Sequence, residues 1–278
     1  MSRQTSTISP LEGRRFFKRA VLITFIASSL ASTAGAETPE EKGLTIANEV
    51  DRRNQNYADT LVEMTMTLID EEGKTDTRQL EVKTLEVNST TEGDKALLLF
   101  NQPRDVAGTT LLTATQLQGE DNQWLYLPAL KRTKRISASN KTASFMGSEF
   151  TYEDLAPQEV RKYRYQFLRE EPCGSLHCFV VEVYPGYANS GYSKLVNWID
   201  NQEYRSHKIE FYDVADKLLK SLTADDYRQY LNQYWRPHQL MMVNHHNGKS
   251  TRLNFGDYRF KTGMQDGDFS PSTLQRNR

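Results

Sequence analysis

The sequence lacks the common signatures of an active site. Its 278 residues contain no G-x-S-x-G nucleophile turn, no H-E-x-x-H zinc helix, no P-loop and no dinucleotide-binding glycine fingerprint. Two acidic pairs, Glu153-Asp154 and Asp225-Asp226, match turns and helix caps better than they match a general acid and base. We therefore expect a protein that is not an enzyme and uses no cofactor.

Histidine is too scarce, and too badly placed, to predict a metal site. There are five histidines, and the adjacent pair His245-His246 falls at the end of an expected strand. Neighbouring residues on a strand point to opposite faces, so these two side chains cannot easily share one ion. Only His177 is near the cysteines, and a zinc site needs further ligands. We predict no bound metal.

Cysteine is limited to two residues, Cys173 and Cys178, separated by four others including Gly174. In an oxidising compartment this spacing favours a disulfide across a short turn. The alternative is a pair of reduced thiols.

The chain has no excess of positive charge. Residues 1–36 carry five basic residues and one acidic residue, so removing them changes the net charge from −1 to −5. A general nucleic-acid binder needs a basic footprint, which this composition does not supply. We therefore expect no nucleic-acid partner.

No apolar run is long enough to span a bilayer comfortably. The longest, Ala20–Leu30, follows a basic segment that includes Arg14-Arg15 and precedes Ala34-Gly35-Ala36. This order predicts a signal peptide over residues 1–36 that is cleaved after Ala36, and hence a periplasmic protein. An uncleaved anchor is the alternative. The general secretory route is favoured over the twin-arginine route, which Arg14-Arg15 matches only in part.

The rest of the chain is dominated by residues that alternate apolar and polar. Residues 39–53 alone show helical spacing, with Thr38 as N-cap and Pro39 in the first turn. Eleven or twelve short strands follow. In one of them the apolar residues change from even-numbered to odd-numbered positions at Leu85 and Val87, which suggests a bulge near residue 85. With no linker or repeat, we predict one mainly β (α+β) domain, residues 37–278, built on a single strongly curved antiparallel sheet.

The stretch Asp121–Leu155 joins the strands before it to those after it. A strand at 123–127 ends at Pro128, and a basic run then leads to a segment that contains Phe145 and Met146. The basic run is either a solvated loop or a contact surface for anionic lipid headgroups or an acidic face of a partner. Its residues are Lys131, Arg132, Lys134 and Arg135.

A curved sheet whose inner face is not filled can hold an apolar ligand. Methionine suits such a lining because its side chain adapts to varied shapes. The alternative, which is favoured for any single one of these residues, is plain core. The expected cavity residues are Val62, Met64, Met66, Leu68, Trp124, Tyr126, Phe145 and Met146.

Several motifs resemble those of the LolA-like, outer-membrane lipoprotein-sorting proteins of the periplasm. The densest is FMGSEFTYEDL, and the similarity covers most of the chain after residue 36. The motifs are Pro103–Thr109, Trp124–Pro128, Arg132 with Lys134-Arg135-Ile136, Phe145–Leu155, and more weakly Trp198–Asp200 and Phe255–Tyr258.

The resemblance implies an unclosed β-barrel with a helical lid, no catalysis, and acyl-chain binding in the concave face. It is strongest to a branch whose members look like accessories of RND-type inner-membrane export pumps, which implies such a transporter as partner and a lipid or lipoprotein as cargo. We expect residues 39–53 and part of residues 137–157 to form the lid.

The sequence leaves two alternative functions open. One is a periplasmic sensor on the same fold that acts through a partner protein without transferring cargo. The other is a periplasmic hydrolase, for which Asp154 and His245 are the first candidate residues.

Overall fold

The computed structural model describes residues 36–275. The predicted signal peptide, apart from Ala36, lies outside the described residues. None of the helices within the described part is both long and apolar enough to cross a membrane.

Helix α1 (Pro39–Asn54) is the one α-helix of the described residues. A capping box begins it: the Glu41 N–H donates to Thr38 Oγ1 (3.1 Å), and the Thr38 N–H donates to Glu41 Oε2 (2.8 Å). One face buries Gly43, Ile46 and Ala47. The predicted helix and its N-cap are confirmed.

All other regular structure is one antiparallel sheet of fourteen strands. This is two more than the upper sequence estimate of twelve, because the short strands β6 and β14 were not predicted. The strands are β1 (Asp59–Ile69), β2 (Thr75–Leu85), β3 (Glu92–Gln102), β4 (Thr110–Gln116), β5 (Asn122–Leu127), β6 (Arg132–Ile136), β7 (Tyr163–Cys173), β8 (Leu176–Pro185), β9 (Tyr192–Asp200), β10 (Ser206–Asp213), β11 (Leu218–Tyr230), β12 (Tyr234–Asn244), β13 (Ser250–Phe255) and β14 (Arg259–Phe260).

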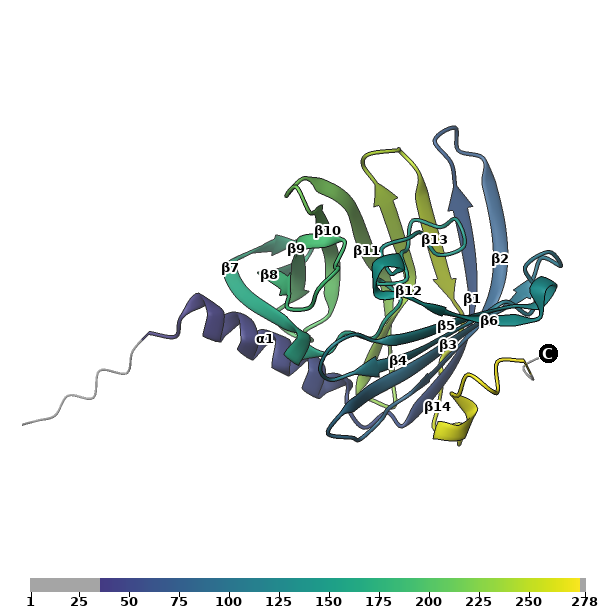
Figure 1. The fold of residues 1–278 in the computed structure, drawn as a ribbon. Helices are drawn as coiled ribbons and strands as arrows, with labels where there is room; N and C mark the ends of the chain where they lie inside the picture. The colour runs from purple at the N-terminus through teal and green to yellow at the C-terminus, as the bar shows by residue number, and fades with distance from the viewer. Residues whose placement is uncertain (1–35, 276–278) are drawn as a thin grey trace, which may run out of the picture. The chain divides into compact units, whose positions relative to one another are not determined.

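Two meanders make up the sheet, β1 to β6 and β7 to β13, and each strand pairs with its neighbour in sequence. The meanders are joined by β1 and β13, where Met64 lies opposite Phe255. This leaves β6 and β7 as the two edges, and they do not pair with each other within residues 36–275. The sheet therefore curves into an open barrel (Figure 1), and the predicted fold class is confirmed.

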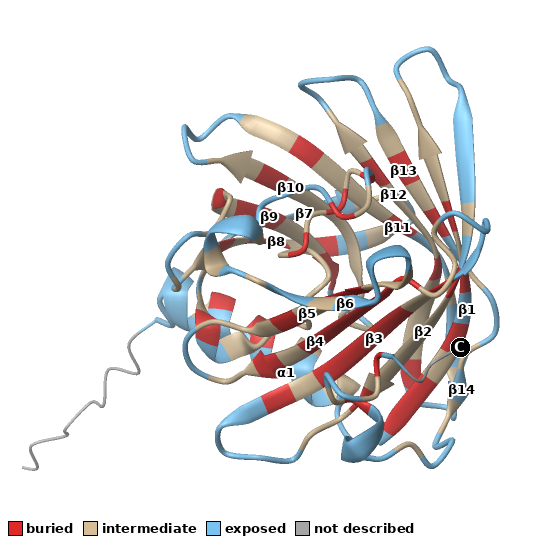
Figure 2. Ribbon diagram, turned by 45° about the vertical axis from the view of Figure 1, so that its right-hand side comes forward, coloured by how far each residue is buried: buried red, intermediate tan, exposed pale blue. Residues whose placement is uncertain are grey.

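The main core lies on the concave, inner face of the sheet. It joins buried side chains of both meanders, such as Met66 and Leu98 from one and Val181 and Met242 from the other. Residues so distant along the sheet meet only across its concave side. Figure 2 shows the buried segments in both meanders.

A second core lies on the outer face of the first meander. Phe269 and Leu274 of the C-terminal segment cover Leu97, Leu112 and Tyr126 there, and Leu274 has no exposed surface. The sheet is therefore apolar on both faces in this region, which explains the near-continuous hydrophobic run of β3.

This second core corrects two expectations. Trp124 and Tyr126 belong to it, so they point away from the concave face and do not line an inner cavity. Leu85 also belongs to it, and β1 pairs with β2 without interruption as far as Asp59 opposite Leu85. The apolar residues change position along β2 because both faces of the sheet are apolar there, and the expected bulge near residue 85 is absent from the β1–β2 pairing.

Candidate functional site

The segment between β6 and β7 folds into the concave side of the barrel. We call residues 137–157 the inner-face loop. Phe145 has no exposed surface, and its ring centroid lies 5.7 Å from that of Phe100 and 5.5 Å from that of Tyr152. Phe150 is buried in the same cluster. The loop thus covers the inner face with aromatic side chains, in the position expected of a lid.

A buried ion pair fixes this loop to the second meander. Lys220 Nζ of β11 lies 2.5 Å from Asp154 Oδ2 and also donates to the Glu149 carbonyl (3.0 Å). The Tyr192 hydroxyl donates to Asp154 Oδ1 (2.7 Å), and the Thr151 N–H donates to Oδ2 (2.7 Å). Both oxygens of Asp154 are therefore occupied by structural partners.

The other two carboxylates of the motif, Glu149 and Glu153, attach the loop to two further connections of the second meander. Glu153 accepts hydrogen bonds from Tyr187 Oη (2.8 Å), Ser190 Oγ (2.6 Å) and the Gly191 N–H (2.9 Å), all in the β8–β9 connection. Glu149 Oε2 accepts from Asn244 Nδ2 (2.7 Å) at the β12–β13 hairpin. The carboxylates of the FMGSEFTYEDL motif thus attach the loop to the strands and connections around it.

The hydrolase alternative gains no geometric basis from these contacts. Asp154 is buried with Lys220, whereas His245 is exposed and its Nε2 lies 3.0 Å from Ser221 Oγ. No hydrogen bond joins Asp154 to His245. Residues 36–275 contain no cluster of three or more potential metal ligands.

Six of the eight expected cavity residues come together on the inner face. On β1, Val62, Met64 and Met66 are at most 2% exposed, and Leu68 is half-buried against the same core. The inner-face loop supplies the remaining two, Phe145 and Met146. In this conformation the loop fills the space over β1, so the residues form packed core beneath a cover.

The basic run forms the free edge of the sheet. Lys131, Arg132, Lys134 and Arg135 are all exposed, and the adjoining Leu130 is 63% exposed. Charged side chains on an edge strand oppose unwanted pairing with other chains. They also leave a basic strip with one apolar residue open to solvent.

The two cysteines are joined. A disulfide links Cys173 to Cys178 across the β7–β8 hairpin, with a Cα–Cα distance of 5.8 Å. It lies at the end of β7, the edge strand against which α1 packs.

A cavity of about 520 Å³ opens at the C-terminal end of α1. No local sequence motif predicts this cavity, because its walls come from α1, the β9–β10 connection and the β11–β12 hairpin. Its lining residues are Val50, Arg52, Arg53, Asn54, Glu203, Tyr204, Arg205, Ser206, Tyr227, Gln229, Asn232, Gln233, Trp235, Arg236 and Pro237. A concentration of arginine and aromatic residues is the one signal that points to this region.

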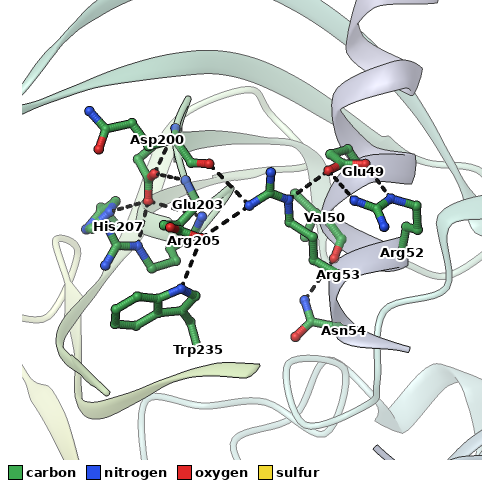
Figure 3. A network of polar contacts seen from close by, with 11 residues as sticks. Glu49, Val50, Arg52, Arg53, Asn54, Asp200, Glu203, Arg205, His207 and Trp235 are labelled. Atoms are coloured by element: carbon green, nitrogen blue, oxygen red, sulfur yellow. Dashed lines mark hydrogen bonds and ion pairs between the residues drawn. The ribbon is translucent and has the colours of Figure 1, made fainter. Parts of the chain in front are cut away.

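Ion pairs hold the wall of this cavity in place (Figure 3). Arg53 of α1 reaches Glu49 Oε1 (2.7 Å) and Glu203 Oε2 (3.3 Å), and Trp235 Nε1 also donates to Glu203 (3.1 Å). Arg205 Nε donates to the fully buried Asp200 (2.8 Å).

Asp200 is ionised despite its burial. Burial by itself raises the pKa of this carboxyl, but hydrogen bonds from the Glu203 N–H, Arg205 and His207 outweigh it and lower the pKa to about 2. The charge on Asp200 therefore fixes Arg205 at the cavity wall throughout the physiological pH range.

Comparison with known proteins places this geometry among lipoprotein-sorting folds. A domain from Vibrio parahaemolyticus that is named for outer membrane lipoprotein sorting is 48% identical, with a TM-score of 0.83; the match covers 85% of this chain and 100% of that one. A DUF1329 family protein from Desulfovibrio piger is 27% identical, with a TM-score of 0.80, over 85% and 99% of the two chains.

A LolA superfamily protein from Nitrosomonas europaea shares the fold, with a TM-score of 0.66 at 19% identity over 82% and 97% of the two chains. A family model described as "Uncharacterized protein" matches residues 92–276. No curated protein sequence matches this chain.

Proposed function

Because this chain belongs to the LolA-like family of outer-membrane lipoprotein-sorting proteins, we propose that it is a periplasmic carrier that binds a lipid or the acyl chain of a lipoprotein. The observation that carries the proposal is the apolar concave face of an unclosed sheet, covered by a loop that makes no ladder with the strands beneath it. Such a cover can leave without breaking the sheet.

In the proposed mechanism, the inner-face loop and α1 act as the lid. Phe145 occupies space that an acyl chain would take when the loop is displaced, and Met64 and Met66 would then contact the chain. Burial of apolar surface stabilises the complex by about 25 cal/mol per Å². The aromatic contacts of Phe145 are lost at the same time, so the net affinity depends on their difference.

The N-terminal segment supports a periplasmic location. We propose that residues 1–36 are a signal peptide, cleaved after Ala36 and directed to the general secretory pathway. Cell fractionation followed by N-terminal sequencing of the purified protein tests this, with Glu37 as the expected first residue. Retention in the membrane fraction with an intact N-terminus would indicate an anchor instead.

The exposed edge strand is the proposed contact surface for membranes or a transporter. Lys131, Arg132, Lys134 and Arg135 present four positive charges next to Leu130, a combination that suits anionic headgroups or an acidic protein face. We propose an inner-membrane export pump of the RND type as the partner. Affinity capture from membranes, with a quadruple glutamine variant as control, tests this surface separately from cargo binding.

The decisive experiment for cargo is native mass spectrometry of protein purified from the periplasmic fraction, followed by lipid extraction and displacement of a fluorescent fatty acid. Copurifying lipid and displacement are the expected results. Absence of both would argue strongly against a carrier.

A matched pair of variants locates the site. Phe145→Ala and Phe269→Ala each remove a buried phenyl ring, the first from the inner core and the second from the outer core. Both should lower stability by about 3–5 kcal/mol. Only Phe145→Ala should change the affinity for the fatty acid.

A further inference from the structure

The cavity at the end of α1 has an unusual charge. Four arginines line it, Arg52, Arg53, Arg205 and Arg236, and the one acidic residue in the lining is Glu203. Glu49 and Asp200 lie behind the wall and pair with the first three arginines directly. The positive charge is therefore neutralised everywhere except at Arg236.

Arg236 has no anionic partner among the described residues. Its guanidinium donates from Nη1 to Asn54 Oδ1 (2.7 Å) and to the Trp235 carbonyl (3.0 Å), and no carboxylate within residues 36–275 lies at ion-pair distance. Burial lowers its pKa. A charge held away from water without a counter-ion is costly, so this position is suited to receive an anion.

Aromatic rings offset only part of that cost. The Arg236 guanidinium carbon lies 5.6 Å from the ring centroids of Tyr234 and Phe260 and 6.0 Å from that of Tyr57. A cation over an aromatic ring at such a distance is attracted to it, but far more weakly than to a carboxylate. These contacts hold the side chain in place without neutralising it.

The neighbouring arginines are fixed before any ligand arrives. Figure 3 shows the Arg205 side chain held by Asp200. The Arg205 guanidinium lies 4.6 Å from the Trp235 ring centroid, and that of Arg53 lies 4.6 Å from the Tyr204 ring centroid. A planar guanidinium matches the oxygen geometry of phosphate and carboxylate groups. Side chains already ordered by the protein lose little entropy on binding.

The inner end of the cavity is apolar. Val50 and Tyr204 line the cavity and also pack against the main core of the barrel. A molecule whose charged group contacts Arg236 can thus extend an apolar portion towards the concave face. The volume of about 520 Å³ lies within the range of roughly 300–1,000 Å³ usual for small-ligand sites.

We infer that this cavity binds the anionic group, phosphate or carboxylate, of an amphiphilic ligand, with Arg236 as its main contact and Arg53 and Arg205 beside it. The inference rests on the proposed carrier function and adds the chemical class of the cargo. The same chemistry is shared by a lipid headgroup and a free anion, and the test separates the two sources.

The test compares the affinities of three ligands: dodecyl phosphate, dodecanol and inorganic phosphate. Calorimetry with delipidated protein from the periplasmic fraction should show dodecyl phosphate binding at least tenfold more tightly than either of the others. Its affinity should fall at higher salt, because the contact is ionic. Equal affinity for dodecyl phosphate and inorganic phosphate would show that the apolar chain contributes nothing to binding. That result would contradict both the inferred amphiphilic ligand and the carrier function.

Variants assign the contact to Arg236. Arg236→Gln should lower the affinity for dodecyl phosphate at least tenfold and leave the affinity for dodecanol unchanged. Arg236→Lys should recover part of the lost affinity. Arg228→Gln, at an exposed ion pair outside the cavity, is the control and should bind as the unaltered protein does. Circular dichroism verifies folding, and Arg205→Gln gives a second, independent variant.

If dodecanol binds as tightly as dodecyl phosphate and Arg236→Gln changes neither affinity, the inference is wrong while the carrier function stands. If the protein binds none of the three probes, both are wrong.

Discussion

Lys220 and Asp154 form an ion pair from which water is almost excluded: Nζ and Oδ2 lie 2.5 Å apart, and the two side chains are 2% and 4% exposed. Lys220 belongs to β11 and Asp154 to the inner-face loop. This single contact therefore joins the cover of the barrel to the wall beneath it.

Replacing one member of this pair should release the loop. In Asp154→Asn the ammonium of Lys220 loses its counter-ion, and a buried charge left alone typically costs about 3–5 kcal/mol. Urea unfolding should show this loss, and amide exchange within residues 137–157 should accelerate more than exchange in β8 or β12.

The double variant Asp154→Asn/Lys220→Met serves as the control, because it removes both charges and should recover much of the lost stability. A second control is Asp226→Asn at the exposed pair with Arg228, which should cost about 1 kcal/mol or less. Equal losses at the buried and exposed pairs would contradict the anchoring role.

Gly43 sets how closely α1 packs on the edge of the sheet. A Cβ at this position would lie 2.9 Å from the backbone nitrogens of both Gln166 and Phe167 in β7. Alanine normally stabilises a helix interior by about 1 kcal/mol relative to glycine, but here we expect Gly43→Ala to destabilise by about 1–3 kcal/mol.

Thermal unfolding measures the effect of Gly43→Ala. Gly267→Ala, where an added Cβ would have no neighbour within 4 Å, is the control and should be near neutral. An increase in stability at Gly43 would mean that α1 is not held against β7 by this contact.

Asp200 should make the free energy of unfolding depend on pH. Its pKa falls from an ordinary value near 3.8 to about 2 in the folded state, so the native carboxylate stabilises the fold fully above the ordinary pKa. This contribution, roughly 2 kcal/mol, is lost as the pH falls from about 4 towards 2. Asp200→Asn should therefore be less stable than the unaltered protein at pH 6, with a smaller difference at pH 3. Urea unfolding at both values measures it; a constant difference would contradict the lowered pKa.

The C-terminal segment should be essential for the outer core. Leu274 is fully buried, so Leu274→Ala should cost about 2–5 kcal/mol in the free energy of unfolding and increase binding of a hydrophobic dye. Leu231, at 59% exposure, is the matched control, and its replacement by alanine should change stability by less than about 0.5 kcal/mol. Similar effects of both would show that the segment does not cover the sheet in solution.

Local patterns in the sequence predicted the local structure well. Thr38 and Glu41 specify where α1 begins, and the alternation from Val62 to Leu68 specifies a strand with one apolar face. Alternation states which residues share a face but not which face is concave. Trp124 and Tyr126 were therefore placed on the wrong side, because the C-terminal segment that covers them lies far away in the chain.

The full length of the strands around the cavity could not be predicted, for a different reason. Asp225-Asp226 and Pro237 both argue against a strand, yet β11 and β12 continue through them, with Tyr227 opposite Pro237. The pairing of β12 with β13 begins only at Gln239, so Pro237 can point its nitrogen away from any partner. The cavity itself is formed by a helix, a connection and a hairpin that only the folded topology brings together.

The arrangement of the sheet also suggests the order in which the chain folds. Within each meander every strand pairs with the next one in sequence, so these contacts close short loops, which form quickly. The pairing of β1 with β13, at Met64 and Phe255, must bring together the most distant parts of the chain. We therefore expect two half-sheets to form early and the inner-face loop, which connects them, to reach its buried position only when they combine. During synthesis the concave apolar face of the first half-sheet stays exposed until the second half-sheet has been made. In that interval the newly made protein most needs a chaperone.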